Sequence, residues 1–385
     1  MNVPKLRFKE FTDEWKKEKF KDFSYYSGKR NRNNLPLIAY SITNTNGFVP
    51  QTEAHNEFGY MKNTDRTAYN IVTSNSFAYN PARINVGSIG YYSGKEDIIV
   101  SSLYEVFKLK NYINDKFIWY WLKSEKLPYW INKLQEGSVR QYFYYDKLCE
   151  TFLYHPSLRE QIKISNTLEL LDKKIELQTK KIEDLKLFKK GLIKKFFSEN
   201  NLKQIKIKEI GEIITGTTPS KSVSNYWDNG NIIWVTPTDI NDNRDINDSI
   251  FKITYNGLKN GKFIPKNSIL VTCIASIGKN AILKVDGSCN QQINAIIPNK
   301  NYNYNYIYYL MEFISNYMKS IAGTSATAII NKDDFSKIVV KVHSKERQDY
   351  IDSILSQFED KVLLEKSRLK QLTQLKKGLM QNMFV

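Results

Sequence analysis

The chain has 385 residues, with 57 Lys and Arg against 40 Asp and Glu, and a formal net charge of +17. Such a charge favours a polyanionic partner, with nucleic acid ahead of an anionic membrane surface. No apolar run of about 18 residues is present and Met1 to Lys21 is charged throughout, which argues against a membrane span or a signal peptide. The three cysteines, Cys149, Cys273 and Cys289, are too scattered for a disulfide framework or a zinc site. We therefore expect a soluble, intracellular protein with reduced thiols.

The first part of the chain, residues 1–154, has the pattern of short strands between turn signals. Asn70 to Thr73, Ser76 to Tyr79 and Asp97 to Val106 are rich in β-branched and aromatic residues. Asp115 to Leu134 follows as a candidate helical hairpin. These patterns predict an α+β globule.

A long amphipathic helix is predicted next, over residues 155–200. Its apolar residues step by three and four, as the a and d positions of a coiled coil do. They are Leu168, Leu171, Ile175, Ile182, Leu185 and Leu192.

A second globule is predicted over residues 201–342. It contains four β-rich stretches and a second candidate helical hairpin over Tyr304 to Ile321. The stretches are Gln204 to Ile214, Asn231 to Val235, Ser268 to Ile274 and Gln292 to Ile297.

The last segment, residues 343–385, repeats the helix. Lys189-Lys190-Gly191-Leu192 recurs as Lys376-Lys377-Gly378-Leu379, 187 residues later, and the apolar seam recurs with the same shift. Two helices that each carry one apolar stripe can bury it against each other. We expect an antiparallel coiled coil that separates two α+β globules with curved, mostly antiparallel sheets, in which about 40 residues of helix would span about 60 Å. The second seam consists of Leu355, Phe358, Val362, Leu369, Leu372 and Leu379.

Several motifs, together with the duplicated helix, resemble the specificity subunits of type I restriction-modification systems. The resemblance covers the whole chain, although the first globule lacks a Thr-Pro-Ser or Tyr-Trp motif. The motifs are Val3-Pro4-Lys5-Leu6-Arg7-Phe8, Phe11-Thr12-Asp13-Glu14-Trp15, Gly216-Thr217-Thr218-Pro219-Ser220, Tyr226-Trp227, Ile233-Trp234-Val235-Thr236-Pro237-Thr238-Asp239-Ile240, Ser276-Ile277-Gly278-Lys279 and Asn290-Gln291-Gln292-Ile293-Asn294-Ala295-Ile296.

The resemblance implies a bacterial, cytoplasmic protein that serves defence against foreign DNA. Each globule would be a target recognition domain that reads one half of a bipartite double-stranded DNA site. The helices would set the spacing and dock two adenine-methyltransferase (M) subunits, through which motor-nuclease (R) subunits join. The chain itself would be non-catalytic and bind no cofactor, while S-adenosylmethionine, ATP and Mg would belong to the partner subunits.

The missing catalytic motifs agree with such a division of labour. No run of the form G-x-x-x-x-G-K-[ST] is present, so the sequence gives no sign of an ATP-driven motor. Asn80-Pro81-Ala82-Arg83 lacks the second proline and the aromatic residue of an Asn-Pro-Pro-Tyr loop and is interpreted as a turn. The histidines and cysteines do not have the spacing of a metal site.

Candidate DNA contacts are loop residues with basic, amide or hydroxyl side chains, which suit phosphates and base edges. Asn290 and Gln291 could instead cap and cross-link strands, and any single lysine or arginine could be a solvated surface charge. In the second globule the candidates are Thr217, Thr218, Ser220, Lys221, Lys279, Asn290, Gln291 and Thr324. In the first they are Lys29, Arg30, Arg32, Arg66, Arg83, Lys95, Arg140, Gln141 and Tyr142.

Two alternatives remain at this point. A basic structural adaptor would bind DNA without regard to sequence, through contacts that depend steeply on salt. A self-contained DNA-modifying enzyme would methylate or cut DNA unaided, and the missing motifs argue against it.

Overall fold

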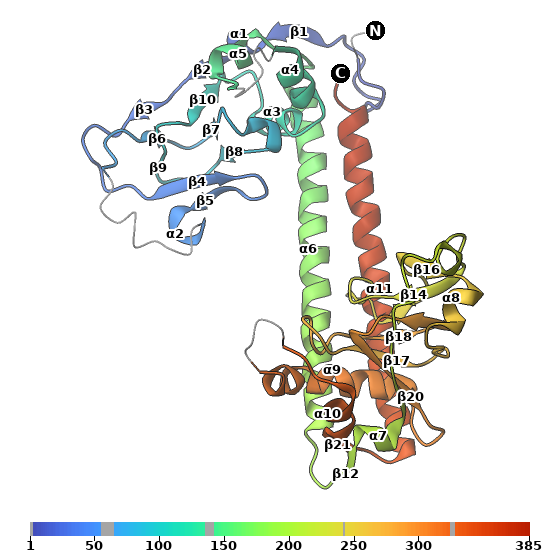
Figure 1. The fold of residues 1–385 in the computed structure, drawn as a ribbon. Coiled ribbons are helices and arrows are strands. Elements are labelled where there is room, and N and C mark those ends of the chain that lie inside the picture. Colours follow the sequence, from blue (N-terminus) through green and yellow to red (C-terminus); the bar gives the residue numbers. More distant parts are fainter. Residues whose placement is uncertain (1–2, 55–64, 135–141, 242, 324–327) are drawn as a thin grey trace. The chain divides into compact units, whose positions relative to one another are not determined.

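The computed structural model describes residues 3–54, 65–134, 142–241, 243–323 and 328–385. The chain divides into two compact units, the first comprising residues 1–178 and 368–385 and the second residues 179–367. Two long helices, α6 (Leu158–Phe197) and α11 (Lys345–Asn382), each contribute to both units (Figure 1). Among the described residues, no helix is both long and apolar enough to cross a membrane.

Unit 1 contains two sheets and a short strand pair. The four-stranded sheet has the order β2-β10-β7-β8 and is antiparallel, and the five-stranded sheet has the order β3-β6-β9-β4-β5, in which β4 and β9 run parallel. β1 (Lys16–Lys19) pairs with β11 (Phe152–His155), just before α6 begins. The remaining strands are β2 (Ser24–Tyr26), β3 (Lys29–Arg30), β4 (Ala39–Thr43), β5 (Gly47–Pro50), β6 (Asn70–Val72), β7 (Ser76–Tyr79), β8 (Ile89–Tyr92), β9 (Ile98–Val100) and β10 (Glu105–Leu109), and the helices are α1 (Phe20–Phe23), α2 (Gln51–Ala54), η2 (Ile84–Val86), α3 (Asp115–Leu122), α4 (Lys126–Leu134) and α5 (Tyr145–Glu150).

The main core of unit 1 combines residues from both ends of the sequence. Phe107 of the sheet and Phe117 of α3 are fully buried, and Leu168 of α6 joins them. Met383 and Phe384, at the end of the chain, are each 3% exposed in the same core. Burial of such side chains is the main favourable contribution to folding.

Unit 2 has a related plan. Its five-stranded sheet has the order β13-β20-β17-β18-β15, its three-stranded sheet the order β16-β14-β19, and β12 pairs with β21. Most pairs are antiparallel, while β14–β19 and β15–β18 are parallel. The strands are β12 (Lys203–Lys206), β13 (Gly211–Thr215), β14 (Ile232–Val235), β15 (Asp245–Ile246), β16 (Phe251–Ile253), β17 (Ile269–Thr272), β18 (Asn280–Leu283), β19 (Gly287–Cys289), β20 (Ile293–Pro298) and β21 (Val339–Val342), and the helices are α7 (Ile207–Ile210), η3 (Ser224–Tyr226), α8 (Tyr255–Lys259), α9 (Tyr304–Ile321) and α10 (Lys332–Lys337).

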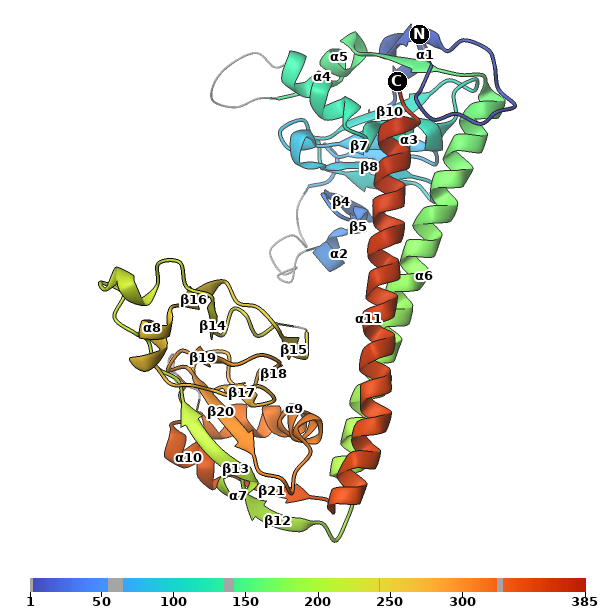
Figure 2. The same ribbon diagram turned by 90° about the vertical axis from the view of Figure 1, so that its right-hand side faces the viewer.

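The five-stranded sheet of unit 2 separates two apolar cores. Because successive strand residues point to opposite faces, Ile269 and Val271 face the core shared with α9, α6 and α11, while Leu270 between them faces a second core. The second core also holds Val235, Cys289 and their neighbours. On this side lies the β16-β14-β19 sheet. We call this sheet, with residues 216–241, 243–244 and 247–268, the outer layer (Figure 2).

The two long helices run antiparallel. In unit 2, Lys181 is paired with Glu365 and Lys189 with Glu359, so the residue number falls along α11 as it rises along α6. In unit 1, Lys376 is paired with Asp172. All twelve residues of the predicted seam are buried or half-buried, and the expected α+β fold with two packed helices is confirmed.

Three details of the expected elements are wrong. Gln204 to Ile214 is not one strand, because Glu209 accepts from the Lys206 N–H at 2.7 Å and closes the short helix α7 between β12 and β13. Asp97 to Val106 is divided by a turn, in which the Tyr104 N–H donates to the Ser101 carbonyl at 3.0 Å. Tyr304 to Ile321 forms the single helix α9 rather than a hairpin. In unit 1 the corresponding segment is divided into α3 and α4 at Ser124, whose hydroxyl donates to the Trp121 carbonyl.

Candidate nucleic-acid interface

Two loops of unit 2 bring four of the predicted contact residues together. Thr217 and Thr218 follow β13, while Asn290 and Gln291 lie between β19 and β20. The Thr217 N–H donates to the Cys289 carbonyl at 2.9 Å, and the Thr218 hydroxyl donates to Gln291 Oε1 at 2.5 Å. Gly216 permits this approach, because a Cβ there would lie 2.3 Å from the Cys289 carbonyl oxygen. We call residues 216–221 and 290–291 the paired loops.

The two amides of the paired loops differ in what they can do. Asn290 is 8% exposed, donates to Gln292 Oε1 at 2.9 Å and accepts from the Gln292 N–H at 3.1 Å. Its side chain is therefore occupied in shaping the turn. Gln291 is exposed, so its Nε2 amide group can reach a base edge.

Ser220 and Lys221 lead from the paired loops into an aromatic cavity of about 370 Å³. Its walls include Trp227, Trp234 and Phe251. The Trp227 Nε1–H donates to the Ser220 carbonyl at 3.1 Å and the Trp234 Nε1–H to the Thr217 carbonyl at 3.0 Å. Trp227 and Trp234 belong to motifs that carry the family resemblance, but neither motif indicated a cavity beside the paired loops. Trp234 is 4% exposed, whereas Phe251 is 50% exposed.

The other two candidates of unit 2 lie elsewhere. Lys279 is exposed at the turn between β17 and β18, where its N–H donates to Thr272 Oγ1 at 3.1 Å. This turn contacts Ala328, because the Ala275 N–H donates to the Ala328 carbonyl. Thr324 lies outside the described residues.

In unit 1, four basic candidates lie around one edge of the five-stranded sheet. Lys29 and Arg30 form the edge strand β3, and Arg30 donates to the carbonyls of Ala68 and Ser102 at 2.7 and 3.2 Å. Arg30 and Arg32 line a cavity of about 530 Å³, and Arg66 directly precedes Thr67 of its wall. Four basic residues therefore lie around this edge, with the carboxylate of Glu105 near Arg30.

The remaining candidates of unit 1 are more dispersed. Arg83 and Lys95 are exposed, one before η2 and the other in the connection between β8 and β9. Tyr142 is 46% exposed and stacks on Tyr144 with ring centroids 5.5 Å apart. Arg140 and Gln141 lie outside the described residues.

Each unit joins its β-rich domain to the helices through a lysine that lies near a tyrosine ring and pairs with an acidic residue. In unit 2, Lys189 lies 5.7 Å from the Tyr309 ring centroid and pairs with Glu312 and Glu359 at 3.1 and 2.5 Å. Burial favours the neutral amine, but the two carboxylates outweigh it and raise the pKa of Lys189. In unit 1, Lys376 lies 5.6 Å from the Tyr120 ring centroid and pairs with Asp172.

A buried glutamine is also duplicated. Gln161 accepts from the Asn114 N–H at 2.8 Å and donates to the Pro156 carbonyl at 2.9 Å. Gln348 accepts from the Asn303 N–H at 3.0 Å and donates to the His343 carbonyl at 2.9 Å. Each glutamine therefore joins the start of a long helix to the first turn of α3 or α9.

The cysteines and acidic residues offer no sign of catalysis or metal binding in the part of the chain that the structure describes. Burial raises the pKa of Cys273 to about 11 and raises that of Cys289 further, so both thiols stay protonated at neutral pH. The described residues contain no group of three or more His, Cys, Asp or Glu that could hold a metal ion.

Comparison with known proteins identifies the family. The model of the type I restriction modification DNA specificity domain matches residues 8–187 and, a second time, residues 199–374. The chain belongs to this family. The same family model thus matches the first and the second half of the chain in turn.

Individual relatives agree. The chain is 33% identical over 186 residues to the type I restriction enzyme MjaIX specificity subunit of Methanocaldococcus jannaschii, covering 47% of this chain and 43% of that protein. It is 31% identical over 172 residues to the EcoR124I/EcoR124II specificity subunit of Escherichia coli, covering 42% of each. The aligned stretches thus span less than half of either relative. Because one relative is archaeal, the family extends beyond the bacterial origin that the resemblance implied.

The fold agrees over a longer stretch. The crystal structure of the type I restriction-modification S subunit from M. genitalium superimposes with a TM-score of 0.59 at 16% identity. The match covers 100% of this chain and 99% of that one. Two β-rich domains joined by two packed helices are therefore the fold of this chain.

Proposed function

We propose that the chain is the non-catalytic subunit that gives a type I restriction-modification complex its DNA specificity. Each recognition domain reads one half of a bipartite double-stranded site. The observation that carries this proposal is the family match to each half of the chain in turn, each half with its own recognition domain and long helix. A net charge of +17 suits the phosphates of both half-sites.

The paired loops read the second half-site. Gln291 offers an amide, the side chain that pairs in two places with adenine in the major groove. Thr218 orients that amide through its 2.5 Å hydrogen bond, and the exposed Lys221 binds phosphate. In the first domain, Lys29, Arg32 and Arg66 supply the phosphate contacts that set the register on the other half-site.

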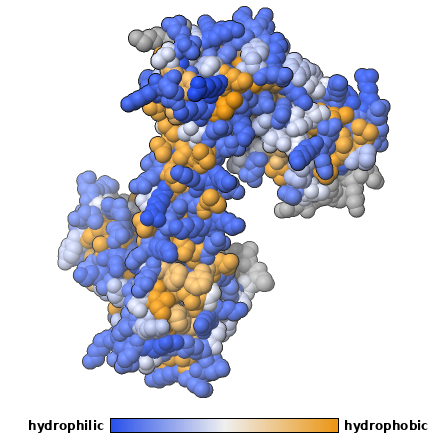
Figure 3. Space-filling view, turned by 180° about the vertical axis from the view of Figure 1, so that it is seen from behind, coloured by the Kyte–Doolittle hydropathy of each residue, from blue (hydrophilic) through white to orange (hydrophobic). Residues whose placement is uncertain are grey.

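Equivalent apolar patches on the helices dock two copies of a methyltransferase subunit. Leu177 and Leu375 are 58% and 51% exposed in unit 1, and Leu364 and Phe188 are 52% and 57% exposed in unit 2. The 187-residue shift of the repeat relates Leu177 to Leu364 and Phe188 to Leu375. Figure 3 shows apolar side chains at the surface among the polar ones. Exposed apolar patches on a polar surface mark partner sites, and motor-nuclease subunits join through the methyltransferases.

The chemistry belongs to the partners in this proposal. S-adenosylmethionine binds to the methyltransferase subunits, and ATP and Mg to the motor-nuclease subunits. A basic adaptor that ignores DNA sequence would not need two different recognition domains, each joined to a copy of the repeated helix. An enzyme that acts alone is disfavoured by the family, whose member here is a specificity subunit.

The direct test is to express the chain with its methyltransferase partner and map methylated adenines on genomic DNA by single-molecule sequencing. We expect methylation at one split motif with a constant spacer. A continuous motif would refute the two-domain reader, and a folded complex that methylates nothing would favour the adaptor.

A variant sharpens this test. Gln291→Ala should change or relax the bases accepted in the second half-site and leave the first unchanged. Gln204→Ala, an exposed glutamine on β12 of the same unit, serves as the matched control and should change neither. If the Gln291→Ala complex methylates the same motif as the complex with the native chain, Gln291 does not contact the DNA bases.

A further inference from the structure

Arg244 stands where the outer layer of unit 2 meets the helices. It ends the loop that runs from β14 to β15, and its carbonyl accepts from the Ile282 N–H of β18 at 2.8 Å. Ile240 and Ile246, on either side of it in the sequence, are 1% and 5% exposed in the second core. The backbone at Arg244 is therefore fixed to the outer layer and to the sheet edge.

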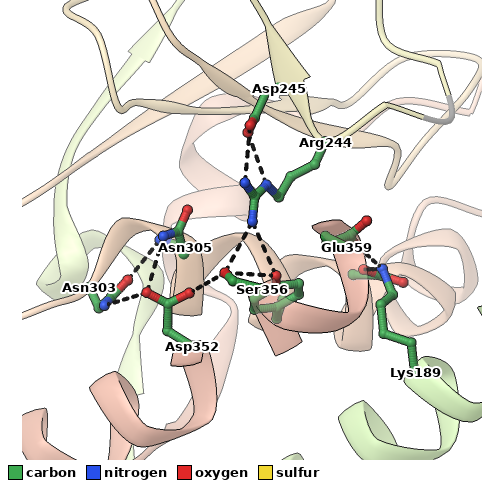
Figure 4. Close-up of polar contacts among 10 residues, drawn as sticks. Lys189, Arg244, Asp245, Asn303, Asn305, Asp352, Ser356 and Glu359 are labelled. Atoms are coloured by element: carbon green, nitrogen blue, oxygen red, sulfur yellow. Dashed lines mark hydrogen bonds and ion pairs between the residues drawn. The ribbon is translucent and has the colours of Figure 1, made fainter. Parts of the chain in front are cut away.

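The Arg244 side chain, by contrast, reaches the helices. Its Nη1 group donates to Ser356 Oγ of α11 at 3.1 Å and to the Tyr309 hydroxyl of α9 at 3.3 Å. Its Nε and Nη2 groups donate to Asp245 Oδ1 and Oδ2 at 2.9 and 3.0 Å. Figure 4 shows the guanidinium between Asp245 and Ser356. The side chain is 14% exposed, so its charge is compensated mainly by Asp245 rather than by water.

The acceptor on α11 is itself held in place. Ser356 donates its hydroxyl proton to Asp352 Oδ1 at 2.6 Å, which leaves its lone pairs for Arg244. Asp352 Oδ2 accepts from the side-chain amides of Asn303 and Asn305 at 2.9 and 3.1 Å. The guanidinium therefore meets an ordered network that spans α9 and α11 (Figure 4).

The paired loops belong to the same layer as Arg244. The Asn290 N–H donates to the Val235 carbonyl at the end of β14 at 3.0 Å, and Trp234 of β14 donates to the Thr217 carbonyl. The connection from the paired loops to Arg244 thus passes through β14 and one loop. Tyr120 of unit 1 corresponds to Tyr309, but its hydroxyl donates to Asp172 Oδ2 at 2.8 Å.

We propose that Arg244 is a positioning residue that fixes the outer layer of unit 2, and with it the paired loops, on α11. A guanidinium suits this role because its planar fork holds Asp245 with two donors and directs a third at the helix. Its consequence for DNA rests on the proposed function. Arg244 touches no base, but it sets where the second reading surface stands relative to the helix and therefore how strictly the complex measures the DNA spacer.

The first experiment tests the positioning without DNA. Spin labels are attached at Lys262→Cys in the outer layer and Lys361→Cys on α11, both exposed positions of unit 2, in a full chain in which Cys149 is replaced by Ser. Electron spin resonance then gives the distribution of distances between the labels. Arg244→Met should broaden this distribution, and Ser356→Ala, which removes the Arg244 acceptor and its hydrogen bond to Asp352 but keeps the guanidinium, should broaden it less. Arg347→Met, a change at an α11 arginine that pairs with Glu199 instead, should leave it unchanged.

An unchanged distribution in both Arg244→Met and Ser356→Ala overturns the proposal. If Arg244→Met does not fold, Ser356→Ala decides alone. Arg244→Lys keeps the positive charge but lacks the planar fork of the guanidinium. The width of its distance distribution should therefore lie between those of the native chain and Arg244→Met.

The second experiment uses the complex with methyltransferase subunits and measures DNA binding. Targets carry a native spacer, a spacer altered by one base pair, or a mismatch in either half-site. Arg244→Met should lower the penalty for the altered spacer by about tenfold, equivalent to about 1.4 kcal/mol, and weaken discrimination at the second half-site only. Equal losses at both half-sites would indicate general damage and overturn the proposal. If the native complex itself recognises no split site, the proposed function fails, whereas the label distances still decide the role of Arg244.

Discussion

Lys189 and its counterpart Lys376 provide a matched pair of perturbations. Lys189→Met removes a lysine side chain that is 12% exposed and leaves the carboxylates of Glu359 and Glu312, 13% and 32% exposed, facing each other. Breaking a buried ion pair costs about 3–5 kcal/mol, and the partial exposure of Glu312 reduces this to about 2–3 kcal/mol. Lys376 and Asp172 are 23% and 41% exposed, so Lys376→Met should cost only about 0.5–1 kcal/mol.

Hydrogen exchange measured by mass spectrometry can separate the two effects, because it reports local stability peptide by peptide. Lys189→Met should accelerate exchange in α9 and in the part of α11 around Glu359 by roughly 30- to 150-fold, and Lys376→Met should accelerate exchange in α3 by no more than about fivefold. Equal acceleration in the two variants, or a larger effect of Lys376→Met, would refute the link between burial of the ion pair and its cost.

Three further predictions concern the helices and the pH response. Replacing Leu185 and Leu372 together by Asp should separate α6 from α11 and abolish binding of methyltransferase subunits in a pull-down, and an intact complex would contradict the seam. Inserting four residues after Lys180 adds about 6 Å to helix α6. Because one base pair spans about 3.4 Å, methylation mapping should show a DNA spacer longer by about one to two base pairs. A change in the half-site sequences themselves would show that the domains and helices are not independent. Burial outweighs the effect of Glu199 and lowers the pKa of His343 from 6.5, so the folded state favours the neutral imidazole. The stability that His343 contributes is therefore present above pH 6.5 and is lost as the pH falls below it. His343→Gln should reduce the fall in Tm between about pH 7.5 and 5.5, and an unchanged fall would exclude His343 as its source.

The long helices and the fold class were predictable because their signals are local and repeated. A seam residue such as Leu168 or Leu355 can be identified from its neighbours three and four positions away, and the repeat supplies its partner. The break at α7 was missed because it depends on one capping side chain, Glu209, within a run of strand-forming residues.

The interface was harder to predict because its residues meet through sheet order. Thr218 and Gln291 touch because β13 pairs with β20 and brings the preceding β19–β20 connection to it. Lys279 also belongs to a motif of the family resemblance. It lies in the β17–β18 turn, however, where its N–H donates to Thr272 and not to the paired loops. Arg244 and Ser356 are 112 positions apart, and nothing near either residue in the sequence indicates the other.

The burial of Met383 and Phe384 in unit 1 has a consequence for synthesis on the ribosome. Residues 179–367 of unit 2 are contiguous, but unit 1 needs residues 368–385, which are made after all of unit 2. At about 5–20 residues per second, roughly 10–40 s pass between translation of Gln178 and of Val385. During that time residues 1–178 lack part of their core, which residues 368–385 complete. A stop codon placed just before Met383 would therefore damage unit 1, although that unit is built mainly from the start of the sequence, and would spare unit 2.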